Sequence, residues 1–422
     1  MAKILVFTSP AKGHLYPVVP VLAELVTRGH DITVVTLPDS RKVLEPLGIS
    51  VRALPPVLAD DTLHDWDASS RIGALRAVLH SLAQRIPHEM EAMRRITAQE
   101  QPDVLLVDIT TPGAQTFAAS SGLLWASWAP MLLPIPSRDV PPFGLGLRPL
   151  RGPLGRLRNA LVQWGLNLVW DQLLPDLNAA RQAEGLPELR HAVDYLAQPP
   201  LILNFTARPF DDVRSDWPTD VQQIGPGLWA PAAEIPQWLT EIDRPLAVVT
   251  CSTEFQDDGV LAQTAMDALA DSDLYTVVTA GALDPASFRV PANARVVQFI
   301  PHHLLLDRAA VVVSHGGMGI TQKALDAGVP VCVVPFGRDQ AEVARRVVSN
   351  GAGTSVSSRR LAADRLRKAI LRARDCRAGA QRVGAGFAAA GGPQRGADLL
   401  ETHFRIAGRD RIAAMSGAPV GR

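Results

Sequence analysis

The chain has 422 residues, of which 47% are hydrophobic and 20% charged; this is the composition of a soluble globular protein, and the length suits two domains. Its 42 basic and 42 acidic residues leave no net charge, which argues against nucleic acid or a membrane surface as the main partner. Three cysteines without a CxxC pair, no apolar run of about 18 residues and no signal-peptide pattern predict a cytoplasmic protein.

The first half alternates continuous apolar strands with helices. We predict strands at 3–8, 31–36, 50–54, 102–108 and 199–207, the last of these closing the first half. Apolar runs without polar alternation are typical of parallel strands that are covered on both faces. Right-handed crossovers then give a doubly wound α/β sheet. Helices are expected near 15–28, 70–99, from 112 onward and across 157–183.

The second half repeats this alternation after a break. Residues 131–160 are rich in Pro, Gly, Leu and Arg and predict a long loop, which is often a binding element. Three prolines mark 224–238 as a linker between domains at 1–223 and 239–394. Ligands of such folds bind at the carboxyl ends of the strands, here in the cleft between the domains. Second-half strands are predicted at 245–253, 274–280, 294–299, 309–315 and 329–335.

Glycines follow the strand that ends at His315. Gly316, Gly317 and Gly319 lie where this strand becomes a helix, so a ligand can approach the backbone N–H groups and positive potential of the helix N-terminus. The pattern predicts a phosphate or diphosphate site, although it is neither a Walker loop nor GxGxxG. The alternative is that the glycines only allow tight packing of strand and helix.

An acidic–amide pair, Asp339-Gln340, ends the next strand. A carboxylate that accepts and an amide that both donates and accepts hydrogen bonds suit a polyol such as a sugar. The alternative is that Asp339 caps the following helix. Beside a diphosphate site, the pair indicates a sugar attached to that diphosphate.

His14 and Asp108 end up at the same sheet edge in this scheme. His14 opens the first helix after strand 3–8, and Asp108 ends strand 102–108. A carboxylate that orients an imidazole makes a general base, as in a catalytic triad without its serine. The alternatives are a histidine that only bonds helix backbone and an aspartate that caps the helix after Pro112.

Three segments carry a resemblance to a known family. They are TSPAKGHLYPVVPVLAELVTRGHDITVVT, PDVLLVD and VVQFIPHHLLLDRAAVVVSHGGMGITQKALDAGVPVCVVPFGRDQ. Together they resemble the UDP-glycosyltransferase superfamily, in its bacterial macrolide and natural-product type with the GT-B fold, over nearly the whole chain. The resemblance implies that helix 395–408 crosses back to the first domain, ahead of a tail at 409–422.

The resemblance implies a role for each matching residue. His14 corresponds to the base that deprotonates the acceptor, and Asp108 to the aspartate that holds it. Phe299 stands where the family has a tryptophan stacked on the nucleobase, and His302 where a glutamine is common. The residues implied in donor binding are Ser252, Thr253, Phe299, His302, His315, Gly316, Gly317, Met318, Gly319, Thr321, Asp339 and Gln340.

Two positions depart from the family pattern. Lys323 stands where the family often has a glutamate that grips the ribose, so ribose recognition does not carry over. Gly319-Ile320 replaces the usual Asn or Ser, so phosphate contacts are expected to rely on backbone and Thr321.

The resemblance implies an inverting transfer of a hexose from a UDP- or TDP-sugar to a hydroxyl of an apolar natural product, without a metal or other cofactor. We expect a monomer or homodimer. Trp66, Trp125 and Trp128 are candidate acceptor-binding walls together with the loop at 131–150, and core packing is the alternative for each tryptophan.

Two other functions remain open on the same fold. A sugar-nucleotide epimerase would need no acceptor pocket, against which the apolar loop argues. A non-catalytic homologue that activates a partner protein would not need the pair of His14 and Asp108.

Overall fold

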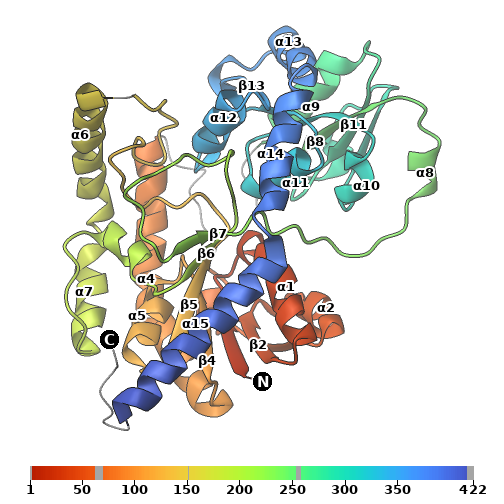
Figure 1. Cartoon of the computed structure of the whole chain (residues 1–422). Coiled ribbons are helices and arrows are strands. Elements are labelled where there is room, and N and C mark those ends of the chain that lie inside the picture. Colours follow the sequence, from red (N-terminus) through yellow and green to blue (C-terminus); the bar gives the residue numbers. More distant parts are fainter. Residues whose placement is uncertain (1, 62–69, 151, 253–257, 416–422) are drawn as a thin grey trace.

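A computed structural model describes residues 2–61, 70–150, 152–252 and 258–415. It contains two separate parallel sheets, each packed with helices, and confirms the predicted α/β fold with two doubly wound units (Figure 1). Every strand pair in both sheets is parallel, as the continuous apolar runs predict. The inner strands of each sheet are buried along most of their length, while the edge strands are partly exposed.

The first sheet has seven strands in the order β3-β2-β1-β4-β5-β6-β7. Its central strand β1 lies between β2 and β4, so the carboxyl ends of β1 and β4 are neighbours. The strands are β1 (Lys3–Phe7), β2 (Asp31–Thr36), β3 (Ser50–Ala53), β4 (Val104–Asp108), β5 (Leu124–Ala129), β6 (Ile202–Asn204) and β7 (Val221–Gln223).

The second sheet has six strands in the order β10-β9-β8-β11-β12-β13. Strand β11 pairs with β8 on one side and β12 on the other, which brings the segments after these three strands together. The strands are β8 (Leu246–Thr250), β9 (Tyr275–Thr279), β10 (Ala294–Val297), β11 (Ala309–Ser314), β12 (Val331–Val333) and β13 (Gly353–Ser355).

Helices connect the strands and cover the sheets. In the first unit they are α1 (Lys12–Thr27), α2 (Arg41–Leu44), α3 (Pro56–Ala59), α4 (Arg71–Glu100), α5 (Pro112–Ser120), α6 (Gly152–Trp170) and α7 (Leu174–Ala183). In the second they are α8 (Gln237–Thr240), α9 (Gly259–Leu269), α10 (His303–Leu306), α11 (Met318–Asp326), α12 (Gln340–Ser349), α13 (Ala363–Arg374), α14 (Arg377–Ala389) and α15 (Gly392–Met415). Short 3₁₀ turns lie at Pro38–Ser40, Glu45–Leu47, Ala192–Ala197, Pro285–Ser287 and Ser358–Arg360.

Three strands were not predicted from the sequence. Strand β5 follows a helix directly and its sequence, LWASWA, has two tryptophans that suggested a binding wall instead. Strands β7 and β13 are three residues long and lie at sheet edges, where a short polar segment such as VQQ pairs on one side only. The prediction that 199–207 holds the last strand of the first half is therefore wrong, because β7 follows it.

The two units pack against each other and share the last helix. Leu132, Ala207 and Phe210 of the first half belong to the same buried apolar cluster as the second sheet. Helix α15 (blue in Figure 1) lies across the first unit and packs on α1. There Arg28 Nη1 on the segment after α1 donates to Asp398 Oδ1 at 2.7 Å and to Glu401 Oε2 at 2.9 Å. No helix among the described residues is long and apolar enough to cross a membrane.

Candidate active site

His14 and Asp108 meet at the carboxyl edge of the first sheet. Asp108 is the last residue of β4, and His14 lies in the first turn of α1, which the chain reaches soon after β1 ends at Phe7. His14 Nδ1 is 3.1 Å from both Asp108 Oδ1 and Asp108 Oδ2. The side chain of His14 is 22% exposed while that of Asp108 is wholly buried, so only the histidine reaches the surface.

The surrounding residues hold Asp108 in place. Ser9 donates its N–H and its hydroxyl to Asp108 Oδ2 at 3.1 and 2.8 Å, and Thr110 donates both groups to Asp108 Oδ1 at 2.9 Å. Burial disfavours the Asp108 carboxylate, but the charge and hydrogen bond of His14 and these backbone donors outweigh it, so its pKa lies well below the usual range. Asp108 therefore stays ionised beside His14.

The structure contradicts the alternative in which Asp108 caps the helix after Pro112. Thr111 is the N-cap residue of α5, and the Asp108 carboxylate is occupied elsewhere. Glu89 of α4 instead accepts the N–H groups of Gly113 and Ala114 at 2.9 and 3.3 Å on its Oε2. No sequence pattern indicates this role, because Glu89 comes from a different helix.

The glycine segment after β11 brings the backbone and His315 close together. Gly316 has φ +102°, and a Cβ there would lie 2.9 Å from Val333 Cγ1, so only glycine fits. A Cβ on Gly317 would lie 2.7 Å from His315 Nε2, which places the ring directly over the start of α11. A Cβ on Gly319 would meet nothing within 4 Å, so the first turn of the helix is open at this point. Met318 is buried and Thr321 has no exposed surface.

A second carboxylate, Asp258, supports His315. Asp258 Oδ2 lies 3.3 Å from His315 Nδ1 and accepts the Ser252 N–H at 2.7 Å. Asp258 is buried and immediately precedes α9, so it joins the segment after β8 to the segment after β11. Sequence reasoning missed it; the only available signal was an acidic residue close to the end of a strand. Thr253 lies outside the described residues.

Asp339 and Gln340 lie beside the glycine segment, as expected from the pairing of β11 with β12. Asp339 is in the N-cap position of α12, but its side chain makes no capping hydrogen bond, so capping does not account for the carboxylate. Gln340 Oε1 accepts the N–H groups of Phe336 and Gly337 at 2.7 and 3.0 Å, which fixes the loop before the helix.

The charges of both units act on Asp339. Burial raises the pKa of Asp339, and the positive charges of Arg338, His315 and His14 lower it by less. Within the second unit, the structure brings the glycine segment and the acidic–amide pair together: a Cβ on Gly316 would lie 3.2 Å from Gln340 Cβ.

Comparison with known proteins identifies the family. Residues 263–402 match the model described as "Erythromycin biosynthesis protein CIII-like, C-terminal domain". The 4'-demethylrebeccamycin synthase of Lentzea aerocolonigenes is 32% identical over 386 residues, which cover 87% of this chain and 91% of that protein. The chain belongs to the natural-product glycosyltransferases. The resemblance stated from the motifs is confirmed.

More distant relatives and solved structures agree with this assignment. The NDP-glycosyltransferase YjiC of Bacillus subtilis is 23% identical over 368 residues, covering 86% of each chain. The calicheamicin glycosyltransferase CalG4 superimposes with a TM-score of 0.73 at 22% identity, over 96% of this chain and 98% of that one. The glycosyltransferase VinC gives 0.69 at 22% identity, over 96% and 100%. These structures show that the glycosyltransferase has the GT-B fold.

Phe299 and His302 are the residues of the glycosyltransferase predicted to lie beside the nucleobase of the donor. Phe299 is 66% exposed after β10, so its ring is available for stacking. Burial, followed by the positive charges of Lys323 and His303, lowers the pKa of His302 to about 4, so this imidazole is neutral at pH 7. His302 Nε2 lies 3.4 Å from Thr279 Oγ1.

Lys323, in place of the ribose-binding glutamate, binds the linker. Its Nζ donates to the carbonyl oxygen of Trp229 at 2.9 Å, and burial lowers the pKa of its ammonium. Trp229 in turn packs on Tyr16 of α1, with ring centroids 4.9 Å apart. The side chain thus ties the second unit to the linker and, through Trp229, to the helix that carries His14.

The tryptophans of β5 belong to the interior. Trp125 and Trp128 are 8% and 0% exposed and pack in two apolar clusters of the first unit, which favours the core-packing alternative over an acceptor wall. Trp128 Nε1 also donates to the carbonyl oxygen of His14 at 3.1 Å, so it supports the helix turn beneath the histidine. Trp66 lies outside the described residues.

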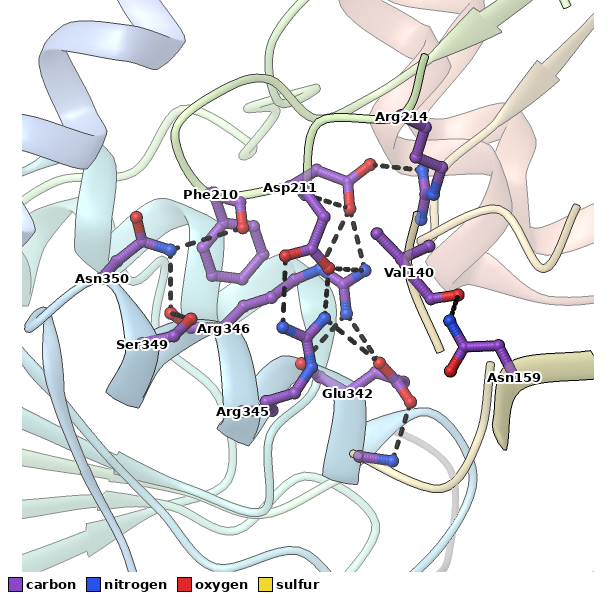
Figure 2. Close-up of polar contacts among 12 residues, drawn as sticks. Val140, Asn159, Phe210, Asp211, Arg214, Glu342, Arg345, Arg346, Ser349 and Asn350 are labelled. Atoms are coloured by element: carbon purple, nitrogen blue, oxygen red, sulfur yellow. Dashed lines mark hydrogen bonds and ion pairs between the residues drawn. The ribbon is translucent and has the colours of Figure 1, made fainter. Parts of the chain in front are cut away.

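A buried ion cluster, which no motif indicated, joins the two units of the glycosyltransferase (Figure 2). Arg346 of α12 contacts Asp211 Oδ1 through Nη2 at 2.9 Å and Glu342 Oε2 through Nη1 at 2.8 Å. Arg214 Nη1 donates to Asp211 Oδ2 at 3.1 Å. Arg345 pairs with Asp212, whose pKa is lowered because the arginines outweigh its burial. We call these six residues the ion cluster: Asp211, Asp212, Arg214, Glu342, Arg345 and Arg346.

The ion cluster also holds the loop at 131–150. Glu342 Oε1 accepts the N–H groups of Gly144 and Gly146 at 3.2 and 2.7 Å. Gly146 has φ +64°, and a Cβ there would lie 2.8 Å from the carbonyl oxygen of Ala341, so the loop lies against the first turn of α12. The predicted acceptor loop is therefore fixed to the helix that begins at Gln340.

Among the described residues, no group of three or more His, Cys, Asp or Glu side chains could hold a metal ion. The expectation that the reaction uses no metal stays a prediction.

Proposed function

We propose that this glycosyltransferase moves a hexose from a TDP- or UDP-linked sugar to a hydroxyl group of an apolar natural product, with inversion at the anomeric carbon. The observation that carries the proposal is the pair of 3.1 Å contacts between His14 Nδ1 and the two oxygens of Asp108. A carboxylate at Nδ1 favours the tautomer with the proton on that nitrogen. Nε2 is then the basic nitrogen.

The bonds change in one displacement. His14 Nε2 takes the proton of the acceptor hydroxyl while the hydroxyl oxygen attacks the anomeric carbon. The bond from that carbon to the diphosphate oxygen breaks, and its electron pair leaves with the nucleoside diphosphate. Asp108 stabilises the imidazolium that forms, because it stays ionised at neutral pH.

In this proposal, groups of the second unit stabilise the negative charge that develops on the departing diphosphate. The N-terminus of α11, with Gly317 and the open Gly319, offers backbone N–H groups, and His315 adds a side-chain donor. The Asp258 carboxylate lies 3.3 Å from His315 Nδ1, without hydrogen-bond geometry, and adds a negative charge on that side of the ring. In this proposal these groups take the place of a metal ion, and Ser252 lies over the phosphates.

The sugar lies against Asp339 in this proposal. Its half-buried carboxylate, whose pKa is raised by burial, gains hydrogen bonds when sugar hydroxyls arrive. Gln340 contributes from the adjacent position. TDP is the first nucleotide to test, because VinC is described in complex with DTDP and the spinosyn rhamnosyltransferase SpnG with thymidine diphosphate. Phe299 is the proposed stacking surface for the base.

The test uses purified protein with TDP-glucose or UDP-glucose and 4-methylumbelliferone, a planar probe acceptor whose fluorescence is lost when its hydroxyl is glycosylated. We expect loss of fluorescence with equal release of nucleoside diphosphate, and a β-glucoside from the α-linked donor by proton NMR. Activity should persist in EDTA. Donor consumption that is unchanged by any of a panel of hydroxylated acceptors would instead indicate the epimerase-like function, and an α-glucoside would contradict inversion.

A further inference from the structure

Helix α6 carries a row of large apolar side chains on its outer face. Figure 1 shows α6 at the margin of the molecule, away from the two sheets. A folded monomer rarely leaves so many large apolar side chains exposed together, and such patches mark contact surfaces. The row consists of Leu154 (80% exposed), Leu157 (57%), Leu161 (61%), Trp164 (66%) and Leu168 (60%), and Leu150 (51%) is exposed just before the helix begins.

The packing of the opposite face fixes the direction in which this row points. Gly155, Asn159 and Val169 are buried against the rest of the protein. Asn159 Nδ2 donates to the carbonyl oxygen of Val140 at 3.0 Å, as Figure 2 shows. A Cβ on Gly155 would lie 2.0 Å from the carbonyl oxygen of Leu150, so the residue before the helix folds back against its first turn. The helix cannot turn its apolar row inward without losing these contacts.

The spacing of the row is that of a helix-pairing seam. Successive members are separated alternately by three and four residues from Leu154 to Leu168. An alternating spacing of three and four residues gives the period of 3.5 that keeps an apolar seam facing a second helix. A helix that lies on a membrane has a broader apolar face and turns its polar face to water, whereas the other face of α6 is packed on protein.

The row also matches a reversed copy of itself. Counted from Asn159, Leu154 and Trp164 lie at equal distances on the two sides, and so do Leu157 and Leu161. An antiparallel second copy therefore opposes the members of each pair, and Leu168 faces the segment at Leu150 that precedes the helix. A two-fold interface requires this kind of self-complementary surface. We infer that two copies of this chain associate through α6, with the two helices antiparallel and the two-fold axis crossing between Leu157 and Leu161, at the level of Asn159, whose side chain points to the opposite face.

The exposed area is sufficient for the start of such an interface. Burying a large apolar side chain removes roughly 60–120 Å² of apolar surface from water, so the five side chains of the row supply about 300–600 Å² per protomer. Standard interfaces bury about 800 Å² per partner. Flanking residues of the exposed face, among them Pro153, Arg156 and Ala160, lie where they can contribute the remainder.

The experiment measures the mass of the full chain by sedimentation equilibrium across about 0.1–50 μM, the range in which a dimer with micromolar Kd dissociates. We expect a reversible dimer. The double variant Leu157→Glu/Leu161→Glu places four carboxylates at the centre of the proposed interface, so it should be monomeric at all these concentrations with an unchanged melting temperature. Leu371→Glu, at an exposed leucine of α13, is the matched control and should remain dimeric.

A cross-linking experiment tests the antiparallel register. Leu157→Cys/Leu161→Cys should form a disulfide-linked dimer under mild oxidation, because the two positions oppose each other. The single variant Leu168→Cys should not, since its partner position is Leu150. A wild-type monomer throughout, a dimer that survives the glutamate substitutions, or monomers that instead pellet with phosphatidylglycerol vesicles would each overturn the inference.

Discussion

Two buried polar groupings of this glycosyltransferase use the same carboxylate chemistry to different ends. In the first, Asp108 is wholly buried and ionised beside His14. In the second, the ion cluster, Asp211 is equally buried and ionic partners surround it. The difference is the cation. A histidine gains and loses a proton near neutral pH, whereas a guanidinium keeps its proton.

The two groupings also differ in how far their cationic side chains are exposed to solvent. The His14 side chain is partly exposed, so an acceptor hydroxyl can approach it. Arg346 is almost wholly buried, and its nitrogens contact Asp211, Asp212 and Glu342. The first grouping can therefore exchange a proton with a substrate, and the second can only hold the two units together. Substitutions in each should affect different measurements.

The largest effect is expected at His14 and Asp108, the proposed catalytic pair. His14→Ala should lower the transfer rate by about 10²–10⁴-fold, the usual contribution of a general base. The affinity for TDP, measured by calorimetry, should change less than about twofold, because the proposed nucleotide site is on the second sheet. His88→Ala, at an exposed histidine of α4, is the control and should retain full activity. Unchanged transfer by His14→Ala would rule out the base assignment.

Removing the guanidinium of Arg346 should lower the stability of the folded protein rather than the transfer rate. Arg346→Met leaves Asp211 and Glu342 without their shared partner in a buried site, which costs about 3–5 kcal/mol of unfolding free energy. Urea unfolding would measure this loss. Arg372→Met on the exposed face of α13 should change it by less than about 0.5 kcal/mol. If both variants unfolded at the same urea concentration as the wild type, the cluster would have no role in holding the units.

Substitution of Asp339, the proposed sugar contact, should weaken the binding of TDP-glucose but not that of TDP. Asp339→Ala removes hydrogen bonds to a charged group, each of about 1.5–3 kcal/mol, so TDP-glucose should bind about tenfold or more weakly. TDP alone, which lacks the sugar, should bind as before. Asp364→Ala, at an exposed aspartate of α13, serves as the control. Equal losses for TDP and TDP-glucose would indicate that Asp339 has a structural role only.

Lowering the pH should reveal how much the ionised Asp108 carboxylate contributes to the stability of the folded protein. The pKa of this carboxyl is lower in the folded protein than in the unfolded chain, so its stabilisation is present above about pH 4 and lost as pH falls toward the folded pKa. Between about pH 6 and pH 3 the wild type should therefore lose stability more steeply than Asp108→Asn, by at most about 1.4 kcal/mol per pH unit. Chemical unfolding of both proteins at each pH gives the comparison, and parallel curves would contradict it.

The smallest effect concerns Lys323. Its charge is the second cause, after burial, of the low His302 pKa of about 4. Lys323→Met should raise the His302 pKa by less than about 1, because burial remains. Titration of the imidazole Cε1 proton by NMR measures this, with Lys368→Met on α13 as the control. No change, or a fall, would mean that the ammonium lies farther from His302 than the structure places it.

Most of the fold and the local part of the site could be predicted from the sequence. Continuous apolar strands such as LAVVT and AAVVVS required parallel pairing, and glycines after β11 required an open helix start. His14 and Asp108 could be matched because parallel neighbours end at the same edge. Short edge strands could not be found, since β7 and β13 have three residues each and little apolar character.

The sequence by itself thus determined the fold class, the family and the residues at each strand end, because these depend on periodicity and on backbone conformation within a few residues. Only the tertiary structure decided that Glu89 caps α5 and that Lys323 binds Trp229. It also decided that Glu342 holds Gly146, 196 residues away. Such partners come from elements that meet only when the sheets pack. In the sequence, many charged residues could equally well be the partner, so the pairing cannot be read from it.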